Sequence, residues 1–146
     1  MFVCHGNICR SPMAEFLFKK LIKEKKREND FLVVSTATST EELGNPVYPP
    51  VARILRREGI DYSNKFSVQL KQSDYEKYDY FIGMDDRNIY NMKRIFGLNE
   101  SDKIYKLLEF TGSSRDVADP WYTGEFETTY NDITNGVKAL YEFLNK

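Results

Sequence analysis

Apolar residues along this chain occur both in short continuous runs and in longer stretches with helical spacing. Residues 2–4 and 80–84 are compact apolar runs of the kind that form buried strands. From Pro12 to about Arg27, apolar residues recur every three or four positions and lysines fill the opposite face, which predicts an amphipathic helix. Ser11 before Pro12 predicts an N-cap followed by proline at the first helical position.

The same alternation continues to the end of the chain. Three further strands are predicted at residues 31–34, 66–70 and 103–108. Three further helices are predicted at residues 49–58, 86–96 and 126–144, the first two ended by glycine. Residues 35–40 and the glycine- and proline-containing stretch 112–124 are predicted loops. Strands that alternate with helices predict a three-layer α/β/α fold with a doubly wound parallel sheet, in which ligands bind beyond the carboxyl ends of the strands.

Composition narrows the class of protein without naming a function. The 146 residues are 41% hydrophobic and 29% charged, which is ordinary for one globular domain over residues 1–146. A net charge of −1 gives no overall attraction to nucleic acid or membranes, so neither is expected as a partner. Two cysteines five positions apart, no signal peptide and no apolar run of about 18 residues together indicate a cytoplasmic protein. Nothing in the sequence fixes the oligomeric state, and we expect a monomer or weak dimer.

The first predicted strand ends in a loop that joins a cysteine to an arginine six positions later. The backbone N–H groups of residues 5–10 can surround one tetrahedral anion, and the helix that follows adds its positive end. Gly6 lets the backbone approach closely, and Arg10 can bind two phosphate oxygens at once. The same field favours the thiolate of Cys4, a competent nucleophile toward phosphorus. This chemistry requires neither a metal nor a cofactor.

Residues 3–15, VCHGNICRSPMAE, resemble the signature of the low-molecular-weight protein tyrosine phosphatases. Similar segments follow at residues 35–39, 83–85 and 119–122, so the resemblance covers essentially the whole chain. It implies a four-stranded parallel sheet and hydrolysis of phosphotyrosine in proteins, with inorganic phosphate as the product. It also implies that the loop residues bind the substrate phosphate; these are His5, Gly6, Asn7, Ile8 and Cys9, with Ser11 next to them.

The resemblance assigns the remaining roles to named residues. Asp119, in the sequence Asp-Pro-Trp-Tyr, is the implied general acid and then base, because expulsion of a phenolate requires a proton. Trp121 and Tyr122 are the implied aromatic wall against the substrate ring. Asn7 and Ser11 are implied to hold the loop in shape, and Ser11 to stabilise the thiolate.

Three features depart from the pattern or extend it. The family often adds a histidine to the network behind the loop, but the only histidine here is His5, inside the loop. Cys9 is either a buried thiol or a partner that traps oxidised Cys4 as a disulfide. Glu41 and Glu42 are expected to border the pocket and influence the choice of substrate.

Three other functions are alternatives to phosphotyrosine hydrolysis. An arsenate reductase of the same fold needs a distant resolving cysteine, which this chain lacks. A phosphoarginine phosphatase tends to carry threonine where this chain has Ile8. A catalytically silent phosphotyrosine-binding module needs neither the thiolate of Cys4 nor the acid Asp119.

Overall fold

A four-stranded parallel sheet lies at the centre of the computed structural model, which describes residues 1–146. The strands are β1 (Phe2–Cys4), β2 (Ser35–Ala37), β3 (Phe81–Gly83) and β4 (Ile104–Lys106). Their order across the sheet is β2-β1-β3-β4, and every neighbouring pair is parallel. The predicted α/β fold with a doubly wound parallel sheet is therefore confirmed.

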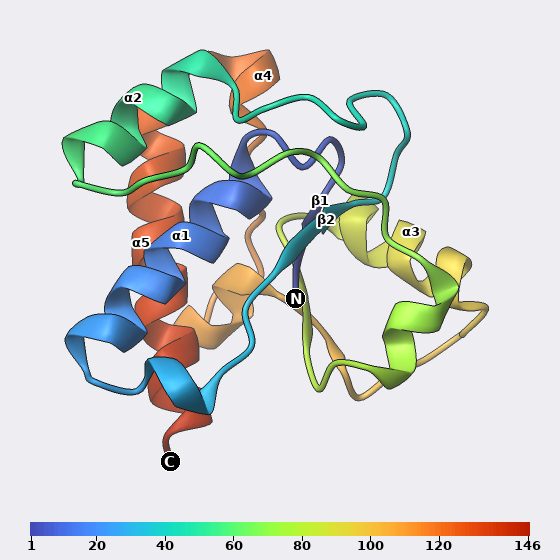
Figure 1. The fold of residues 1–146 in the computed structure, drawn as a ribbon. Coiled ribbons are helices and arrows are strands. Elements are labelled where there is room, and N and C mark those ends of the chain that lie inside the picture. Colours follow the sequence, from blue (N-terminus) through green and yellow to red (C-terminus); the bar gives the residue numbers. More distant parts are fainter.

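Helices cover both faces of this sheet (Figure 1). The α-helices are α1 (Arg10–Glu24), α2 (Pro49–Arg57), α3 (Asp86–Phe96), α4 (Pro120–Thr123) and α5 (Phe126–Leu144). Three short 3₁₀ helices complete the set: η1 (Glu28–Asp30), η2 (Gln72–Glu76) and η3 (Leu107–Thr111). Helices α1, α2 and α5 lie together on one side, and α3 lies on the other. No helix is long and apolar enough to cross a bilayer.

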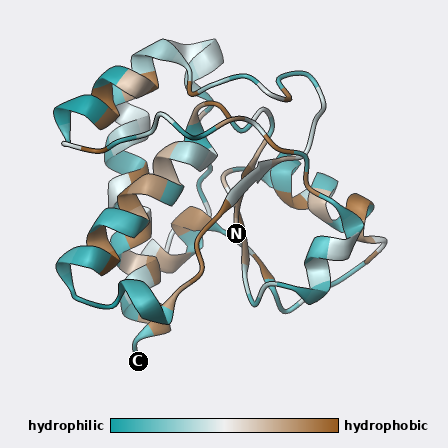
Figure 2. Cartoon of the chain, in the orientation of Figure 1, coloured by the Kyte–Doolittle hydropathy of each residue, from teal (hydrophilic) through white to brown (hydrophobic).

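The alternation of side chains along β1 divides the core into two parts. Phe2 and Cys4 belong to the larger apolar cluster, which includes residues from α1, α2 and α5. Val3 points the other way and joins Phe81 and Met92 in a smaller cluster beneath α3. Apolar ribbon segments accordingly face inward and hydrophilic ones outward (Figure 2). A sheet buried on both faces explains why the two central strands, β1 and β3, are continuous apolar runs.

Several predicted elements occur as expected. Helix α5 occupies residues 126–144, and α3 begins after Asp85, whose side chain accepts a hydrogen bond from Asn88 N. Gly97 ends α3 with a left-handed φ of 70°, the usual glycine C-cap. Helix α4 is a single turn inside the stretch that was predicted to be loop.

Three local predictions were wrong. Residues 31–34 form no strand; β2 instead comprises residues 35–37, which were predicted to be a polar loop. Burial of Ser35 is tolerated because its hydroxyl is hydrogen-bonded on both sides. Residues 66–70 make only isolated bridges to Ala37 and Pro46. Helix α1 begins at Arg10 with Cys9 as its N-cap residue, so Ser11 lies in the first turn, where its hydroxyl contacts a sulfur atom.

Candidate active site

The loop between β1 and α1 curls around the sulfur of Cys4. Backbone N–H groups of Asn7 and Ser11 point to Sγ at N···S distances of 3.3 and 3.4 Å. Asn7 has a left-handed φ of 58°, a conformation that asparagine tolerates better than most residues. Tyr48 N donates to Ile8 O and Ser67 Oγ to Gly6 O, which fixes the loop from the outside. The arrangement places N–H donors and a helix N-terminus around the thiol.

A chain of hydroxyl and amide groups supports the loop from behind. Asn7 Nδ2 donates to Ser11 Oγ at 2.8 Å and to Ser35 Oγ at 2.9 Å. Ser11 Oγ lies 3.0 Å from Cys4 Sγ. All four of these residues are buried. Asn7 and Ser11, the residues predicted to hold the loop in shape, therefore meet in one network, which Ser35 joins.

Arg10 is fixed at the first turn of α1 by groups from distant parts of the chain. Its side chain is 2% exposed; Nη1 donates to Asp85 Oδ2 at 2.7 Å and to Val117 O at 2.9 Å, and Nη2 lies 3.4 Å from Asp119 Oδ2. Burial lowers the pKa of Arg10, but the negative charges of Cys4, Asp85 and Asp119 outweigh it and leave that pKa above its ordinary value. The guanidinium is therefore a permanent cation at the pocket floor.

A cavity of about 110 Å³ opens above the sulfur. The residues that line it are Cys4, His5, Gly6, Ile8, Cys9, Arg10, Glu41, Glu42, Asp119, Trp121 and Tyr122. The side chains of Asn7 and Ser11 lie outside this lining, behind the loop. At the rim, His5 Nε2 lies 2.9 Å from Glu41 Oε2. The structure thus brings the residues predicted for catalysis and the predicted rim glutamates into one pocket.

Asp119 lines the same pocket as Cys4 but comes from a separate segment, at the start of α4. It is the N-cap residue of α4, where Oδ1 accepts a hydrogen bond from Trp121 N at 3.1 Å. Its second oxygen, Oδ2, faces Arg10. Pro120 fixes the backbone beside it at the first helical position. One carboxylate oxygen is therefore anchored while the other points toward the Arg10 guanidinium.

The two aromatic residues after Asp119 differ in their packing. The Trp121 ring lies 4.9 Å from the Tyr48 ring, centroid to centroid, and is half exposed. Tyr122 is 83% exposed and has no aromatic partner. Trp121 thus packs against the domain and still lines the pocket with half of its surface exposed, whereas Tyr122 contacts no other ring.

Cys9 is the second free cysteine and it is buried. Burial is the main cause that raises the pKa of the Cys9 thiol far above its ordinary value, and the negative charges of Cys4 and Asp119 raise it further. Cys9 is therefore a neutral thiol at physiological pH.

Sequence reasoning missed three residues that complete the site. Asp85 holds Arg10, a role that the resemblance at residues 83–85 does not assign to it. Glu15 accepts a hydrogen bond from Ser35 Oγ at 2.6 Å, and Lys65 Nζ lies 3.5 Å from the same Glu15 oxygen. The network expected to lack a histidine partner thus contains a buried lysine–glutamate pair. No sequence motif marks Lys65, because the pairing depends on how the chain folds.

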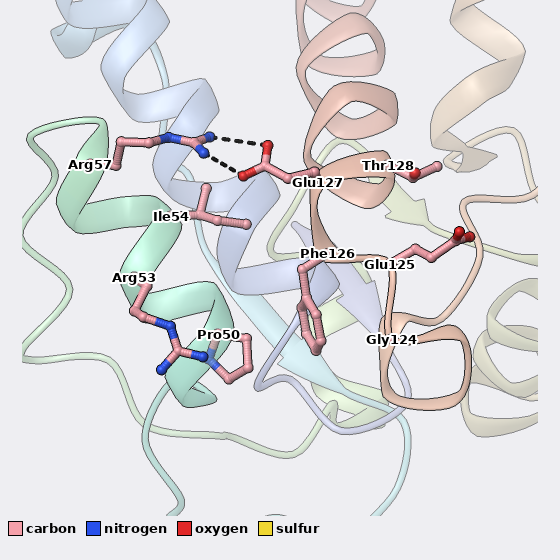
Figure 3. Close-up of a pocket in the computed structure, with 9 residues that line it drawn as sticks. All are labelled: Pro50, Arg53, Ile54, Arg57, Gly124, Glu125, Phe126, Glu127 and Thr128. Carbon is pink, nitrogen blue, oxygen red and sulfur yellow. Dashed lines mark hydrogen bonds and ion pairs between the residues drawn. The ribbon is translucent and has the colours of Figure 1, made fainter.

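A larger and shallower hollow lies between α2 and the start of α5 (Figure 3). Arg57 there forms two hydrogen bonds with Glu127, so its charge is already satisfied. The other lining residues include Arg53, Ile54 and Phe126, and the lining contains no cysteine, serine or histidine. The chemistry of the molecule is therefore concentrated at the smaller pocket around Cys4.

Comparison with known proteins agrees with this geometry. The family model described as low molecular weight phosphotyrosine protein phosphatase matches residues 1–146. The low molecular weight protein-tyrosine-phosphatase YfkJ of Bacillus subtilis is 37% identical over 100% of this chain and 95% of its own length. PtpA of Staphylococcus aureus is 35% identical over 99% of this chain and 92% of its own length.

Solved structures give the same result. The crystal structure of YfkJ from Bacillus subtilis superposes with a TM-score of 0.94 at 37% identity, covering 99% of this chain and 92% of that chain. A low molecular weight protein tyrosine phosphatase from Streptococcus pyogenes superposes with a TM-score of 0.85 at 40% identity, covering 98% of this chain and 90% of that chain.

Proposed function

Since the chain belongs to the low molecular weight phosphotyrosine protein phosphatase family and is a protein-tyrosine-phosphatase, we propose that Cys4 is its nucleophile, Arg10 its phosphate-binding residue and Asp119 its proton donor. The observation that carries this assignment is the convergence of the three on one pocket. N–H groups surround the Cys4 sulfur, and an Asp119 oxygen lies 3.4 Å from the Arg10 guanidinium. A phosphate held by Arg10 would then have sulfur on one side and the acid on the other.

In the first step, the thiolate of Cys4 attacks phosphorus, forming an S–P bond as the P–O bond to the tyrosine ring breaks. Asp119 gives its proton to the departing phenolate oxygen. Arg10 and the loop N–H groups stabilise the charge on the equatorial phosphate oxygens, in a pocket where these donors are already oriented. The products of this step are a protein tyrosine and phosphocysteine.

In the second step, water attacks the phosphorus of phosphocysteine. The Asp119 carboxylate takes a proton from this water, and the S–P bond breaks to release inorganic phosphate. The Ser11 hydroxyl lies 3.0 Å from the leaving sulfur and can donate to the thiolate as it forms. Asp119 is then protonated and ready for the next substrate.

The pocket walls support a phosphotyrosine-containing protein as the substrate. Trp121 and Tyr122 rise beside the loop and offer apolar surface to an aromatic ring, which phosphoserine lacks. Ile8 contributes a further apolar wall. Two free cysteines are consistent with a reducing compartment, so we propose a cytoplasmic location.

The test is turnover of para-nitrophenyl phosphate with EDTA present. The parent protein should hydrolyse it, and Cys4→Ser should have no measurable turnover while keeping the same thermal melting temperature within a few degrees. Residual turnover in folded Cys4→Ser comparable to the parent would remove Cys4 as the nucleophile. An inactive parent protein that still binds phosphotyrosine would instead indicate a silent binding module.

A further inference from the structure

The indole of Trp121 has a single aromatic neighbour. Trp121 lines the pocket around Cys4 from α4, a helix of one turn, and it is half exposed. An indole in such a position can move among its side-chain rotamers unless a neighbour fixes it. The ring that packs against it belongs to Tyr48, at a centroid distance of 4.9 Å and an interplanar angle of 54°. The position of this pocket wall therefore depends on Tyr48.

The backbone of Tyr48 is held on both sides. Tyr48 N donates to Ile8 O, in the loop between β1 and α1, at 3.0 Å, and Tyr48 O accepts from Ala52 N, in α2, at 2.9 Å. Pro49 follows and restricts the residue before it to extended conformations, and Tyr48 has φ −61° and ψ 137°. The side chain of Tyr48 therefore leaves the backbone in a fixed direction relative to the loop that surrounds the Cys4 sulfur.

The ring of Tyr48 is supported from α5 as well. Phe126, the first residue of α5, stacks on it with a centroid distance of 6.0 Å and an interplanar angle of 26°. Both rings are partly buried against the larger core cluster. Figure 1 shows α4 beside α2, which is where the Trp121 and Tyr48 rings meet. A fixed backbone and a stacked ring make Tyr48 a rigid support for the indole.

We propose that Tyr48 is a positioning residue: its ring holds the Trp121 indole beside the pocket before substrate binds, and so contributes to the selection of aromatic phosphoesters. The inference rests on the proposed role of Trp121 as a wall for the substrate ring. A wall that is already in place loses little side-chain entropy when the substrate binds, so more of the contact energy appears as affinity. Inorganic phosphate has no ring to touch the wall, so its affinity should not depend on Tyr48.

The first measurement follows the indole itself. Trp121 is the only tryptophan of the chain, so its fluorescence reports the motion of this one side chain. Time-resolved anisotropy measures that motion on the nanosecond timescale. In Tyr48→Leu, which removes the ring but keeps both backbone bonds, the fast component of the decay should grow. In Tyr48→Phe, which keeps the ring, the decay should match that of the parent protein.

The second measurement compares phenylphosphonate, which carries an aromatic ring, with inorganic phosphate, which lacks one. In calorimetric titration of Tyr48→Leu, the affinity for phenylphosphonate should fall by about three- to tenfold, the size expected for one aromatic pair. The affinity for phosphate should stay within about twofold of the parent, because the backbone bond to Ile8 remains. Tyr105→Leu is the matched control. Tyr105 is a partly buried tyrosine outside the pocket lining that packs against Phe110 and Phe143, and its loss should leave both affinities unchanged.

A folded Tyr48→Leu that keeps the parent's anisotropy decay, or the parent's ratio of the two affinities, would overturn the proposal. An equal loss of phenylphosphonate affinity in Tyr48→Phe or Tyr105→Leu would overturn it too. If Tyr48→Leu does not fold, Tyr48→Met fills a similar volume without a ring and should give the same two results.

Trp121→Leu separates this inference from the proposed function. If Trp121→Leu weakens phenylphosphonate binding and Tyr48→Leu does not, only the role of Tyr48 is wrong. If Trp121→Leu leaves phenylphosphonate binding unchanged, the proposed wall is wrong, and the role of Tyr48 falls with it. Calorimetry needs no turnover, so a parent protein that binds both ligands but hydrolyses no phosphate ester would contradict the proposed catalytic residues instead.

Discussion

The carboxylate of Asp119 combines two structural tasks at a single residue. One oxygen caps α4 through Trp121 N, and the other faces Arg10. The capping bond fixes the side-chain rotamer, so the second oxygen is held beside Arg10 in the pocket, as the proposed role of proton donor requires. Proximity of this kind accounts for a large part of the rate gained by a positioned acid.

Replacing Asp119 by alanine should slow hydrolysis of phenyl phosphate by about 10²–10⁴-fold, since the phenolate would leave unprotonated. Binding of vanadate should change little, because Arg10 and the loop N–H groups remain. Steady-state kinetics and vanadate inhibition measure the two effects. Glu125→Ala is the matched control, an exposed carboxylate nearby on the chain that lies outside the pocket. Equal rates in Asp119→Ala and the parent would dismiss Asp119 as the acid.

The other cysteine of the loop should be chemically silent. Burial raises the pKa of Cys9, so at pH 8 it stays a thiol, and the thiolate is the form that reacts. In Cys4→Ser, where Cys9 is the only thiol, iodoacetamide labelling of the folded protein should be at least about a hundredfold slower than in urea, given a tenfold loss per unit of pKa. Mass spectrometry follows the label. Equally fast labelling in both states would show that Cys9 is accessible and ionised.

At the scale of elements, side-chain packing outweighs helix propensity at one position of α5. Gly136 lies in the middle of this helix, where alanine is ordinarily better by about 1 kcal/mol. A Cβ at this position would, however, lie 2.5 Å from Leu107 Cγ in η3. The glycine permits the close approach of α5 to η3, and the helix forms despite it.

Gly136→Ala should therefore destabilise the protein, by about 1–3 kcal/mol, because overpacking outweighs the gain in helix propensity. Urea unfolding measures the change. Asn135→Ala, at an exposed position of the same helix, should instead stabilise by about 0.5 kcal/mol through propensity alone.

Adding Leu107→Ala to Gly136→Ala should recover part of the stability lost in Gly136→Ala. The effects of the two substitutions on the free energy of unfolding should be coupled by about 1 kcal/mol, because the residues are neighbours. Strict additivity of the two substitutions would show that the cost at Gly136 comes from somewhere other than this contact.

At the scale of the molecule, Arg10 connects segments that are remote in sequence. Its guanidinium joins the first turn of α1 to Asp85, 75 positions away, and to Asp119, 109 positions away. The carboxyl ends of parallel strands meet at one edge of the sheet, which is why these segments converge. A phosphate bound there would contact a guanidinium that already interacts with Asp85 and Asp119.

Inorganic phosphate should therefore raise the melting temperature of the parent protein. At 100 times the dissociation constant the gain is about 2.7 kcal/mol, or about 5–10 °C for a chain of this size. Arg10→Ala should lose this response, whereas Arg53→Ala, in the shallow hollow beside α2, should keep it. Differential scanning fluorimetry with and without phosphate gives the comparison, and an undiminished response in Arg10→Ala would argue against phosphate binding by Arg10.

Much of this architecture follows from local sequence. The apolar run at β3 and the helical spacing of α3 and α5 are encoded by residues close together in the chain, so their periodicity predicts them. The loop from Cys4 to Arg10 is equally local, since its chemistry depends on a strand, a short turn and a helix start in succession. Asp119 was found through its resemblance to a family motif, because chemistry by itself favours no particular carboxylate.

The tertiary structure alone decided where polar groups are buried. Residues 35–37 form an internal strand because Ser35 finds partners in Asn7 and Glu15, from other parts of the fold. Lys65 and Asp85 likewise gain their roles only when distant segments pack against the loop. Spacing along the chain by itself determined β1, β3, the longer helices and the loop from Cys4 to Arg10. How the reacting groups are held and charged depends on contacts across the chain, which no local pattern encodes.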